Sequence, residues 1–237
     1  MCGGDTITIS GEDARHIARS LRMRVGEALT VCDGEGTDYD GVIEELDGES
    51  VTVRVERSHP SKGEPRAQVT VYQGYPKGDK LEFIIEKAVE LGACEIVPVM
   101  TERSVARPDG AQAAKKAVRW QRHALEAAKQ CGRGVVPRVA PLTDFAKLQP
   151  LLERHELVIF CYEEGGMSLR DIFADCAKMP SSVGIFIGAE GGIAQREAQH
   201  LADCGAVAAT LGTRILRCET APIAALTAVM LLSGDMD

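Results

Sequence analysis

Three loops rich in glycine and glutamate carry the residue types in this sequence that are best suited to holding a small ligand. They read EEGGMS at 163–168, AEGGIAQRE at 189–197 and GTRILRCETA at 212–221, and each directly follows an apolar segment. Glycine lets a backbone approach a ligand closely because it has no side chain. The third loop also brings Arg217 and Glu219 together. One such loop would indicate only a turn, whereas three in succession predict a ligand-binding site.

The spacing of the other reactive residues excludes several common kinds of site. The sequence contains neither G-x-G-x-x-G nor G-x-x-x-x-G-K-[ST], which argues against a dinucleotide site and a P-loop. Its five histidines form no H-E-x-x-H pair, and G-x-S-x-G is absent. Its eight cysteines form no C-x₂₋₄-C pair, so we expect reduced, mostly buried thiols and no metal site.

The segments that must position the three loops alternate in type after residue 67. Apolar strands are predicted at 68–74, 94–100, 156–162, 182–188 and 205–211. Helices are predicted at 78–93, 111–131, 168–175, 194–203 and 221–233. This alternation is typical of an open α/β domain with a parallel sheet and helices on both faces. In such a sheet ligands bind beyond the carboxyl ends of the strands, which is where the three loops lie.

A smaller β-rich unit precedes the α/β domain. Its strands are predicted at 6–9, 28–33, 38–46 and 50–56, with a short helix at 11–23 and turns at DGEG and DGES. The polar segment 57–68 contains Pro60, Gly63 and Pro65, which predicts a linker. We therefore expect two domains, 1–66 and 67–237.

The charge distribution indicates a polyanionic partner in spite of its overall sign. The formal net charge is −8, yet residues 103–138 hold nine basic side chains and only Asp109 and Glu126 as acids. A local patch steers a polyanion whatever the sum over the chain. The alternative is a basic helix face that contacts only solvent.

The sequence predicts a cytoplasmic location. No apolar run reaches the roughly 20 residues of a membrane span. The first ten residues, MCGGDTITIS, have neither the basic region nor the apolar region of a signal peptide.

Five ordered blocks resemble one known family. They are 16–36, 77–105, 119–139, IGAEGGIAQRE at 187–197 and LGTRILRCETAPIAAL at 211–226, and together they span nearly the whole chain. The blocks resemble the bacterial ribosomal RNA small subunit methyltransferase E family, which belongs to the SPOUT class. The resemblance implies S-adenosyl-L-methionine as the methyl donor and N3 of one uridine in 16S rRNA as the acceptor. It also implies a homodimer, an N-terminal PUA-like β-barrel domain and a C-terminal SPOUT α/β domain with a trefoil knot.

Two features depart from the pattern of that family. MCGGDTITIS lacks the usual basic and aromatic start of the first strand, which predicts a shortened or altered barrel. Ala189 stands where proline is common, which predicts a less rigid loop.

The resemblance assigns roles to the three loops. A bound adenine needs apolar walls and backbone polar groups, and the loops supply both. The residues expected at the cofactor are Tyr162, Ile187, Gly188, Glu190, Gly191, Leu211, Gly212, Ile215 and Leu216. For Ile215 and Leu216 the alternative is ordinary core packing.

Catalysis is expected to need a cation near the acceptor base, because uridine N3 must lose a proton. Arg217 is the first candidate for stabilising the resulting anion, and Arg103 is the second. Glu219 is expected to orient Arg217 by an ion pair, with proton removal as the alternative. For both arginines, phosphate binding or a structural ion pair is the competing role.

RNA is expected to bind outside the pocket, through basic side chains that track phosphates. The residues expected to do so are Arg15, Arg19, Arg22, Arg24, Lys77, Lys80, Arg119 and Arg133. Tyr75 or Tyr162 could stack on one flipped base. Three other functions stay open, namely a ribose 2′-O-methyltransferase of the SPOUT class, a non-catalytic RNA-binding protein of ribosome assembly, and a metabolic α/β enzyme.

Overall fold

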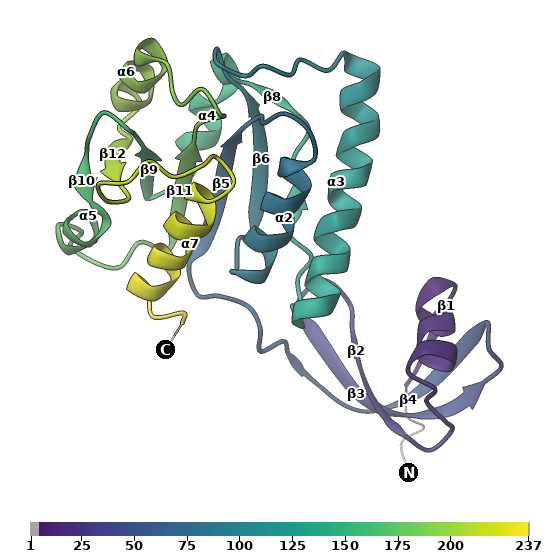
Figure 1. Ribbon diagram of the computed structural model, residues 1–237. Helices are drawn as coiled ribbons and strands as arrows, with labels where there is room; N and C mark the ends of the chain where they lie inside the picture. The colour runs from purple at the N-terminus through teal and green to yellow at the C-terminus, as the bar shows by residue number, and fades with distance from the viewer. Residues whose placement is uncertain (1–4, 237) are drawn as a thin grey trace. The chain divides into compact units, whose positions relative to one another are not determined.

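The computed structural model describes residues 5–236, which divide into two compact units (Figure 1). One unit contains the residues up to Glu64 together with Arg133–Val135, and the other contains Pro65–Gly132 and the residues from Val136 onward. The sequence predicted two domains that meet once, at residue 66, and did not predict that residues 133–135 belong to the first unit. The expectation of mostly buried thiols is wrong for the described residues, where the cysteines are free but Cys218 alone is buried and Cys32 and Cys131 are exposed; Cys2 lies outside the described residues.

The first unit is an antiparallel sheet covered by a short helical segment. The strands are β1 (Thr6–Ser10), β2 (Ala28–Cys32), β3 (Thr37–Leu46) and β4 (Ser50–Pro60), in the order β1-β4-β3-β2. The helical segment is α1 (Glu12–Arg15) followed by a π-helical turn, η1 (His16–Ser20). Its Ala14 and Ile17 pack with Ile43, Val51 and Val53 in one apolar cluster. Among the described residues β1 and β2 are the edges of the sheet.

The predicted linker begins too early. Residues 57–60 continue β4 and pair with residues 37–40 of β3. The Arg57 guanidinium also lies 2.6 Å from the Asp40 carboxylate, so paired strands hold a segment whose composition indicated a loop. The connection to the second unit is therefore shorter than the sequence indicated.

The second unit is built on a parallel sheet. Its strands are β5 (Gln68–Gly74), β6 (Glu95–Met100), β7 (Arg138–Val139), β8 (Thr143–Asp144), β9 (Leu157–Cys161), β10 (Met167–Ser168), β11 (Ser182–Ile187) and β12 (Val207–Thr210). The order is β10-β12-β9-β11-β5-β6-β7, with β8 also paired to β6, and every pairing is parallel. The five predicted strands are confirmed, whereas the short β7, β8 and β10 were not predicted.

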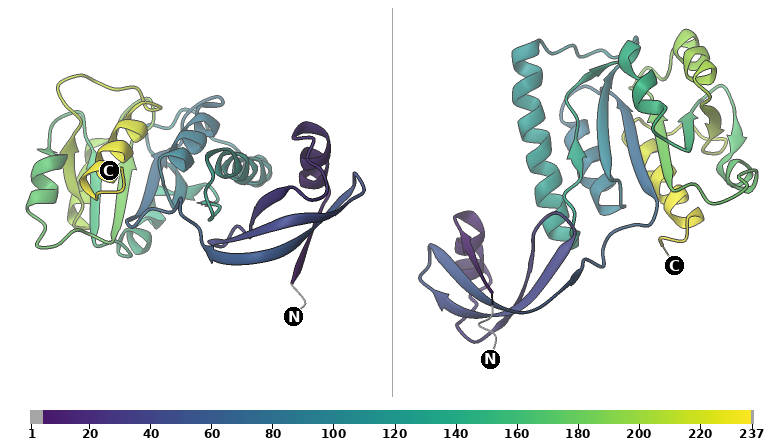
Figure 2. Two further views of the ribbon diagram at one scale, coloured as in Figure 1. Left: turned by 90° about the horizontal axis from the view of Figure 1, so that it is seen from below. Right: turned by 180° about the vertical axis from the view of Figure 1, so that it is seen from behind.

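Helices cover both faces of this sheet, as expected (Figures 1 and 2). They are α2 (Lys80–Glu90), α3 (Gly110–Cys131), the 3₁₀ turn η2 (Phe145–Lys147), α4 (Gln149–Leu152), α5 (Leu169–Ala174), α6 (Gln195–Asp203) and α7 (Ala221–Leu232). One apolar cluster joins α2, α3, α5 and α7 to strand residues such as Val71 and Ile185. The other joins α4 and α6 to the alternate residues Tyr72 and Phe186. Because both faces are buried, each strand is apolar at successive positions.

The strand order decides where the site lies. β12, β9 and β11 are neighbours, so the chain leaves all three at adjacent points on one edge of the sheet. The trefoil knot implied by the resemblance stays a prediction. None of the helices in residues 5–236 combines the length and the apolar composition that a membrane crossing requires.

Candidate active site

The loops after β9, β11 and β12 together line one cavity of about 370 Å³. A volume of this size is typical of a small-molecule site. The expected cofactor residues that line the cavity are Tyr162, Ile187, Gly188, Glu190, Leu211, Gly212, Ile215 and Leu216. The convergence of the three loops predicted from the sequence is therefore present in the fold.

Three apolar side chains differ in how they contribute to this cavity. Ile187 is fully buried at the end of β11 and belongs to the core as well as to the cavity wall. Leu216 is partly buried and packs against the same core. Ile215 is 87% exposed, so it lies at the rim and core packing is excluded for it.

The loop after β11 requires glycine because two stretches of backbone meet there. The Gly192 N–H donates to the Ala189 carbonyl at 3.0 Å, which closes a tight turn. A Cβ atom on Gly188 would lie 2.7 Å from the Gly192 carbonyl carbon, a separation that side chains do not tolerate. Gly191 does not line the cavity, and its carbonyl accepts a hydrogen bond from Arg103 Nη1 at 2.9 Å.

Gln73, near the end of β5, holds this loop through its side-chain amide. The side chain is completely buried, and its Nε2 donates to the carbonyls of Gly188 and Gly74, each at 3.1 Å. Gln73 is not among the residues predicted for the site. The available signal was an amide side chain near the carboxyl end of a strand that is buried on both faces, because a buried amide must find polar partners.

Lys80, at the start of α2, joins the second and third loops. Its Nζ lies 3.2 Å from Glu190 Oε1 and 3.2 Å from Glu219 Oε2. Cys218 Sγ lies 3.8 Å from the same Nζ and donates to Glu219 Oε2 at 3.1 Å. The Lys77 backbone N–H adds a 3.2 Å hydrogen bond to Glu190. We call Lys80, Glu190 and Glu219 the triad.

The triad contradicts the prediction that Lys80 binds RNA phosphates. The ammonium group lies in the cavity wall and is already paired with two carboxylates, so it is not available to a backbone phosphate. These partners come from loops 110 and 139 residues further along the chain, and only the fold brings them together.

Arg217 and Glu219 do not form the predicted ion pair. Glu219 pairs with Lys80, whereas Arg217 is exposed at the cavity rim and has no ion pair within residues 5–236. Arg103 lies 3.6 Å from Glu163 and holds the Gly191 carbonyl, so its contacts are structural. Among the described residues of the cavity lining, Arg217 and Arg214 are both exposed and have no ion pair, so both cations are available to a second ligand at the rim.

Several residues expected to bind RNA are engaged elsewhere. Arg133 is 7% exposed and lies 2.6 Å from Glu64, so the prediction of RNA contact is wrong for this residue. Arg119 pairs with Glu82 at 3.4 Å, although it remains on the surface. Tyr75 is buried against Trp120 and cannot stack on a base.

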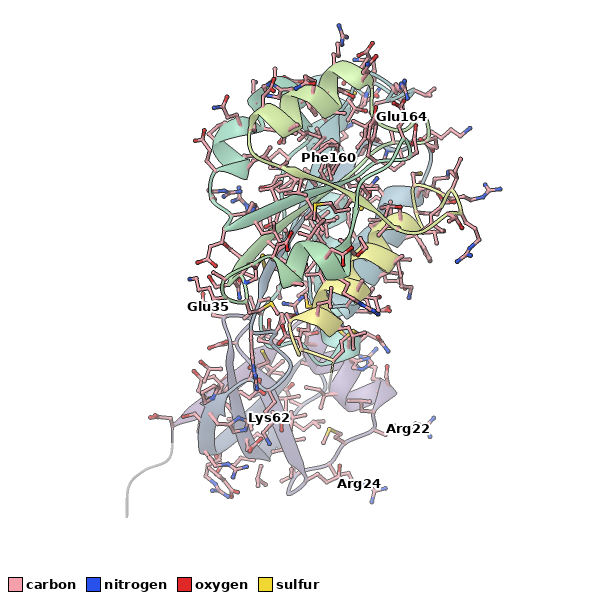
Figure 3. The ribbon with its side chains drawn as sticks, turned by 90° about the vertical axis from the view of Figure 1, so that its left-hand side faces the viewer. Arg22, Arg24, Glu35, Lys62, Phe160 and Glu164 are labelled. Carbon is pink, nitrogen blue, oxygen red and sulfur yellow. The ribbon has the colours of Figure 1, made fainter. Side chains whose placement is uncertain are left out.

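The remaining basic residues divide into two groups. Arg15 and Arg19 both pair with Glu49, at 3.3 and 3.5 Å. Arg22 and Arg24 are exposed, and neither has an ion pair among the described residues. Figure 3 shows both side chains projecting away from the ribbon. The Lys77 side chain is exposed beside the cavity loop that its backbone contacts.

The chain has the architecture of an RNA methyltransferase, with a glycine-lined cavity at the carboxyl edge of a parallel sheet and an additional β unit. Residues 63–230 match the RNA methyltransferase domain family. Residues 9–56 match the RNA methyltransferase PUA domain family.

The chain belongs to the ribosomal RNA small subunit methyltransferase E family. It is 35% identical over 238 residues to the protein of that name from Bacillus subtilis, covering 97% of this chain and 93% of the relative. The Mycobacterium bovis protein of the same name is 34% identical, with 99% and 89% covered. The crystal structure of the Neisseria gonorrhoeae enzyme of that name, bound to S-adenosyl methionine, superposes with a TM-score of 0.84 at 30% identity over 98% of this chain and 94% of that chain.

Proposed function

We propose that this protein transfers a methyl group from S-adenosylmethionine to N3 of a uridine in 16S rRNA of the small ribosomal subunit. The observation that carries the proposal is the cavity made by three converging loops, with the exposed Arg217 at its rim. Family membership supports the reaction class and the cofactor. Because the relatives are bacterial proteins named as ribosomal RNA methyltransferases, we also propose that the protein acts in the cytoplasm.

The residues that line the cavity fit the proposed methyl donor. Ile187, Leu211 and Leu216 offer apolar walls for an adenine ring, and the glycine backbone offers hydrogen-bonding groups without side chains in the way. The triad offers partly buried negative charge, which suits a sulfonium. The residues expected to hold the donor are therefore of the right chemical types.

The protein itself has to orient the two reactants and stabilise charge. When bound, the donor supplies a methyl group whose bond to sulfur breaks as a bond to N3 forms. Uridine N3 must first lose its proton, which passes to solvent water at the rim and leaves negative charge on the base. Arg217 can stabilise that charge from the rim, since no carboxylate among the described residues neutralises it. Glu219 keeps the loop that carries Arg217 in place through its contact with Lys80.

Mass spectrometry of nucleosides tests the proposed reaction. Purified protein incubated with S-adenosylmethionine and small ribosomal subunits that lack the modification is expected to produce 3-methyluridine. Ribose methylation would instead yield 2′-O-methyluridine and would support the alternative SPOUT activity. Donor binding without any methylated product would favour a non-catalytic role in ribosome assembly.

Arg22 and Arg24 are the proposed RNA contacts of the first unit. A double variant, Arg22→Glu with Arg24→Glu, is expected to bind 16S rRNA more weakly. Because two phosphate contacts are lost, the slope of log K against log salt is expected to become shallower by about two. Filter binding over a range of salt concentrations measures both effects.

The matched control for this surface reverses Arg15 and Arg19 instead. Both guanidinium groups already contact Glu49, whose carboxylate offsets one of their two charges, so a smaller change in the salt slope is expected. Equal slopes for the unaltered protein and the Arg22/Arg24 variant would remove this loop from the RNA-binding surface.

The proposed homodimer is supported by α7. This helix is apolar around its whole circumference, and such helices are normally buried. One of its faces is nevertheless partly open, at Ile223, Ala224, Thr227 and Ala228, and Leu231 is 58% exposed. A second copy of the chain is the partner that we propose covers this face, and analytical ultracentrifugation of the purified protein measures the stoichiometry.

A further inference from the structure

The charged side chains around the cavity are not equivalent. The side chains of the triad, Lys80, Glu190 and Glu219, are only 28, 21 and 22% exposed. Arg214 and Arg217 line the same cavity but are exposed to solvent. Glu163 lies 3.6 Å from the Arg103 guanidinium, so these two charges offset each other. Solvent screens exposed charges far more strongly than buried ones, so the triad dominates the local field.

The triad carries a formal charge of −1, since two carboxylates share one ammonium. The hydrogen bond to Glu190 raises the pKa of Lys80, which keeps the ammonium protonated. Burial acts to raise the pKa of Glu190, but hydrogen bonds from backbone N–H groups and from Lys80 outweigh it and lower this pKa. Hydrogen bonds from Cys218 and Lys80 lower the pKa of Glu219. All three groups are therefore ionised at neutral pH. Within the triad, the single ammonium balances only one of the two carboxylate charges.

We propose that the triad makes the cavity select the methyl donor, whose sulfur is positively charged, over the product, whose sulfur is neutral. This inference rests on the proposed function. S-adenosylmethionine carries a sulfonium charge that S-adenosylhomocysteine lacks, and the two molecules are otherwise alike apart from the methyl group. A net negative wall attracts the donor and loses that attraction once the methyl group has left. Lys80 is then a specificity-determining residue, because it limits how negative the wall becomes.

The test is the ratio of two dissociation constants, Kd for S-adenosylhomocysteine divided by Kd for S-adenosylmethionine, measured by calorimetry. Glu219→Gln leaves the triad neutral and is expected to lower this ratio about five- to tenfold. Lys80→Met leaves the triad with a charge of −2 and is expected to raise the ratio by a similar factor. Loss of loop order would weaken both ligands together and leave the ratio unchanged, so the ratio reports charge and not structure.

A control on the same helix separates the triad from a general effect of lysine. Lys87 of α2 also contacts two carboxylates, Glu86 at 2.7 Å and Glu90 at 2.8 Å, but it does not line the cavity. Lys87→Met is therefore expected to leave the ratio unchanged. Lys80→Arg keeps the charge and is expected to preserve the ratio of the unaltered protein.

The outcomes distinguish this inference from the proposed function. Opposite changes in Glu219→Gln and Lys80→Met support the triad as the selecting element. One common ratio in all variants overturns it while leaving the methyltransferase proposal intact. If the unaltered protein binds neither ligand, the proposed function fails first. Should Glu219→Gln not fold, as judged by circular dichroism, Glu190→Gln removes the same charge from the other loop and is expected to lower the ratio.

Discussion

Replacing Arg217 with alanine is expected to reduce the rate of methyl transfer about 10²- to 10³-fold. Arg217 lies at the cavity rim and has no ion pair within residues 5–236, so its charge is available to an acceptor base that loses a proton. Donor affinity is expected to stay within about tenfold, because an exposed side chain contributes little to a pocket formed mainly by backbone and apolar groups. Single-turnover kinetics and calorimetry measure the two quantities separately.

Arg214 provides the matched control for this prediction. It lies three residues earlier in the same loop, it lines the same cavity and it is also exposed. Arg214→Ala removes the same charge from the loop, so a general electrostatic effect would slow both variants equally. A specific role requires a much larger loss at Arg217. If Arg217→Ala abolishes donor binding as well, Arg217 acts on the cofactor and not on the acceptor base.

Replacing Gly188 with alanine is expected to weaken donor binding roughly 10- to 100-fold. The new methyl group would lie 2.7 Å from the carbonyl carbon of Gly192 and 2.9 Å from its oxygen. Both atoms are backbone, so no side-chain rotation relieves the clash and the turn itself must open. The carbonyl of Gly188 also accepts the hydrogen bond from Gln73, so a displaced loop loses its anchor. Calorimetry with S-adenosylmethionine measures the loss.

Gly110→Ala is the control for the Gly188 variant. A Cβ on Gly110, at the start of α3, meets no atom within 4 Å, and neither glycine has a positive φ. The two substitutions therefore differ mainly in the space available. Thermal denaturation should show both variants folded. Unchanged donor affinity in folded Gly188→Ala would mean that this turn does not shape the donor site.

Much of the second unit could be predicted from local patterns. Continuous apolar runs such as Val183–Ile187 indicate strands buried on both faces, and the spacing of Leu81, Ile84 and Ile85 indicates a helix with one apolar side. Both patterns depend on neighbours within a few residues, which the sequence contains in full. The three glycine loops could be found for the same reason, because each follows directly on its own strand.

The charge partners could not be predicted in this way. Arg217 and Glu219 are two residues apart and were expected to pair, yet Glu219 reaches Lys80 on another element. Arg133 was assigned to RNA from its place in a basic stretch, but a 2.6 Å contact with Glu64 buries it. Charged side chains are long and find partners across the chain, so proximity in sequence is a poor guide to pairing.

The sequence by itself determined the type of each major element and the chemistry of the loops, because hydrophobic periodicity and glycine placement act locally. The tertiary structure alone decided that β9, β11 and β12 are neighbours and that Lys80 joins the loops after β11 and β12. It also decided which cations are accessible, because Arg217 is exposed at the cavity rim whereas Arg133 is buried. The physical reason is that strand order and ion pairing arise from contacts between segments that are distant in the sequence, such as Arg133 with Glu64 and Lys80 with Glu219, and local periodicity carries no information about such contacts.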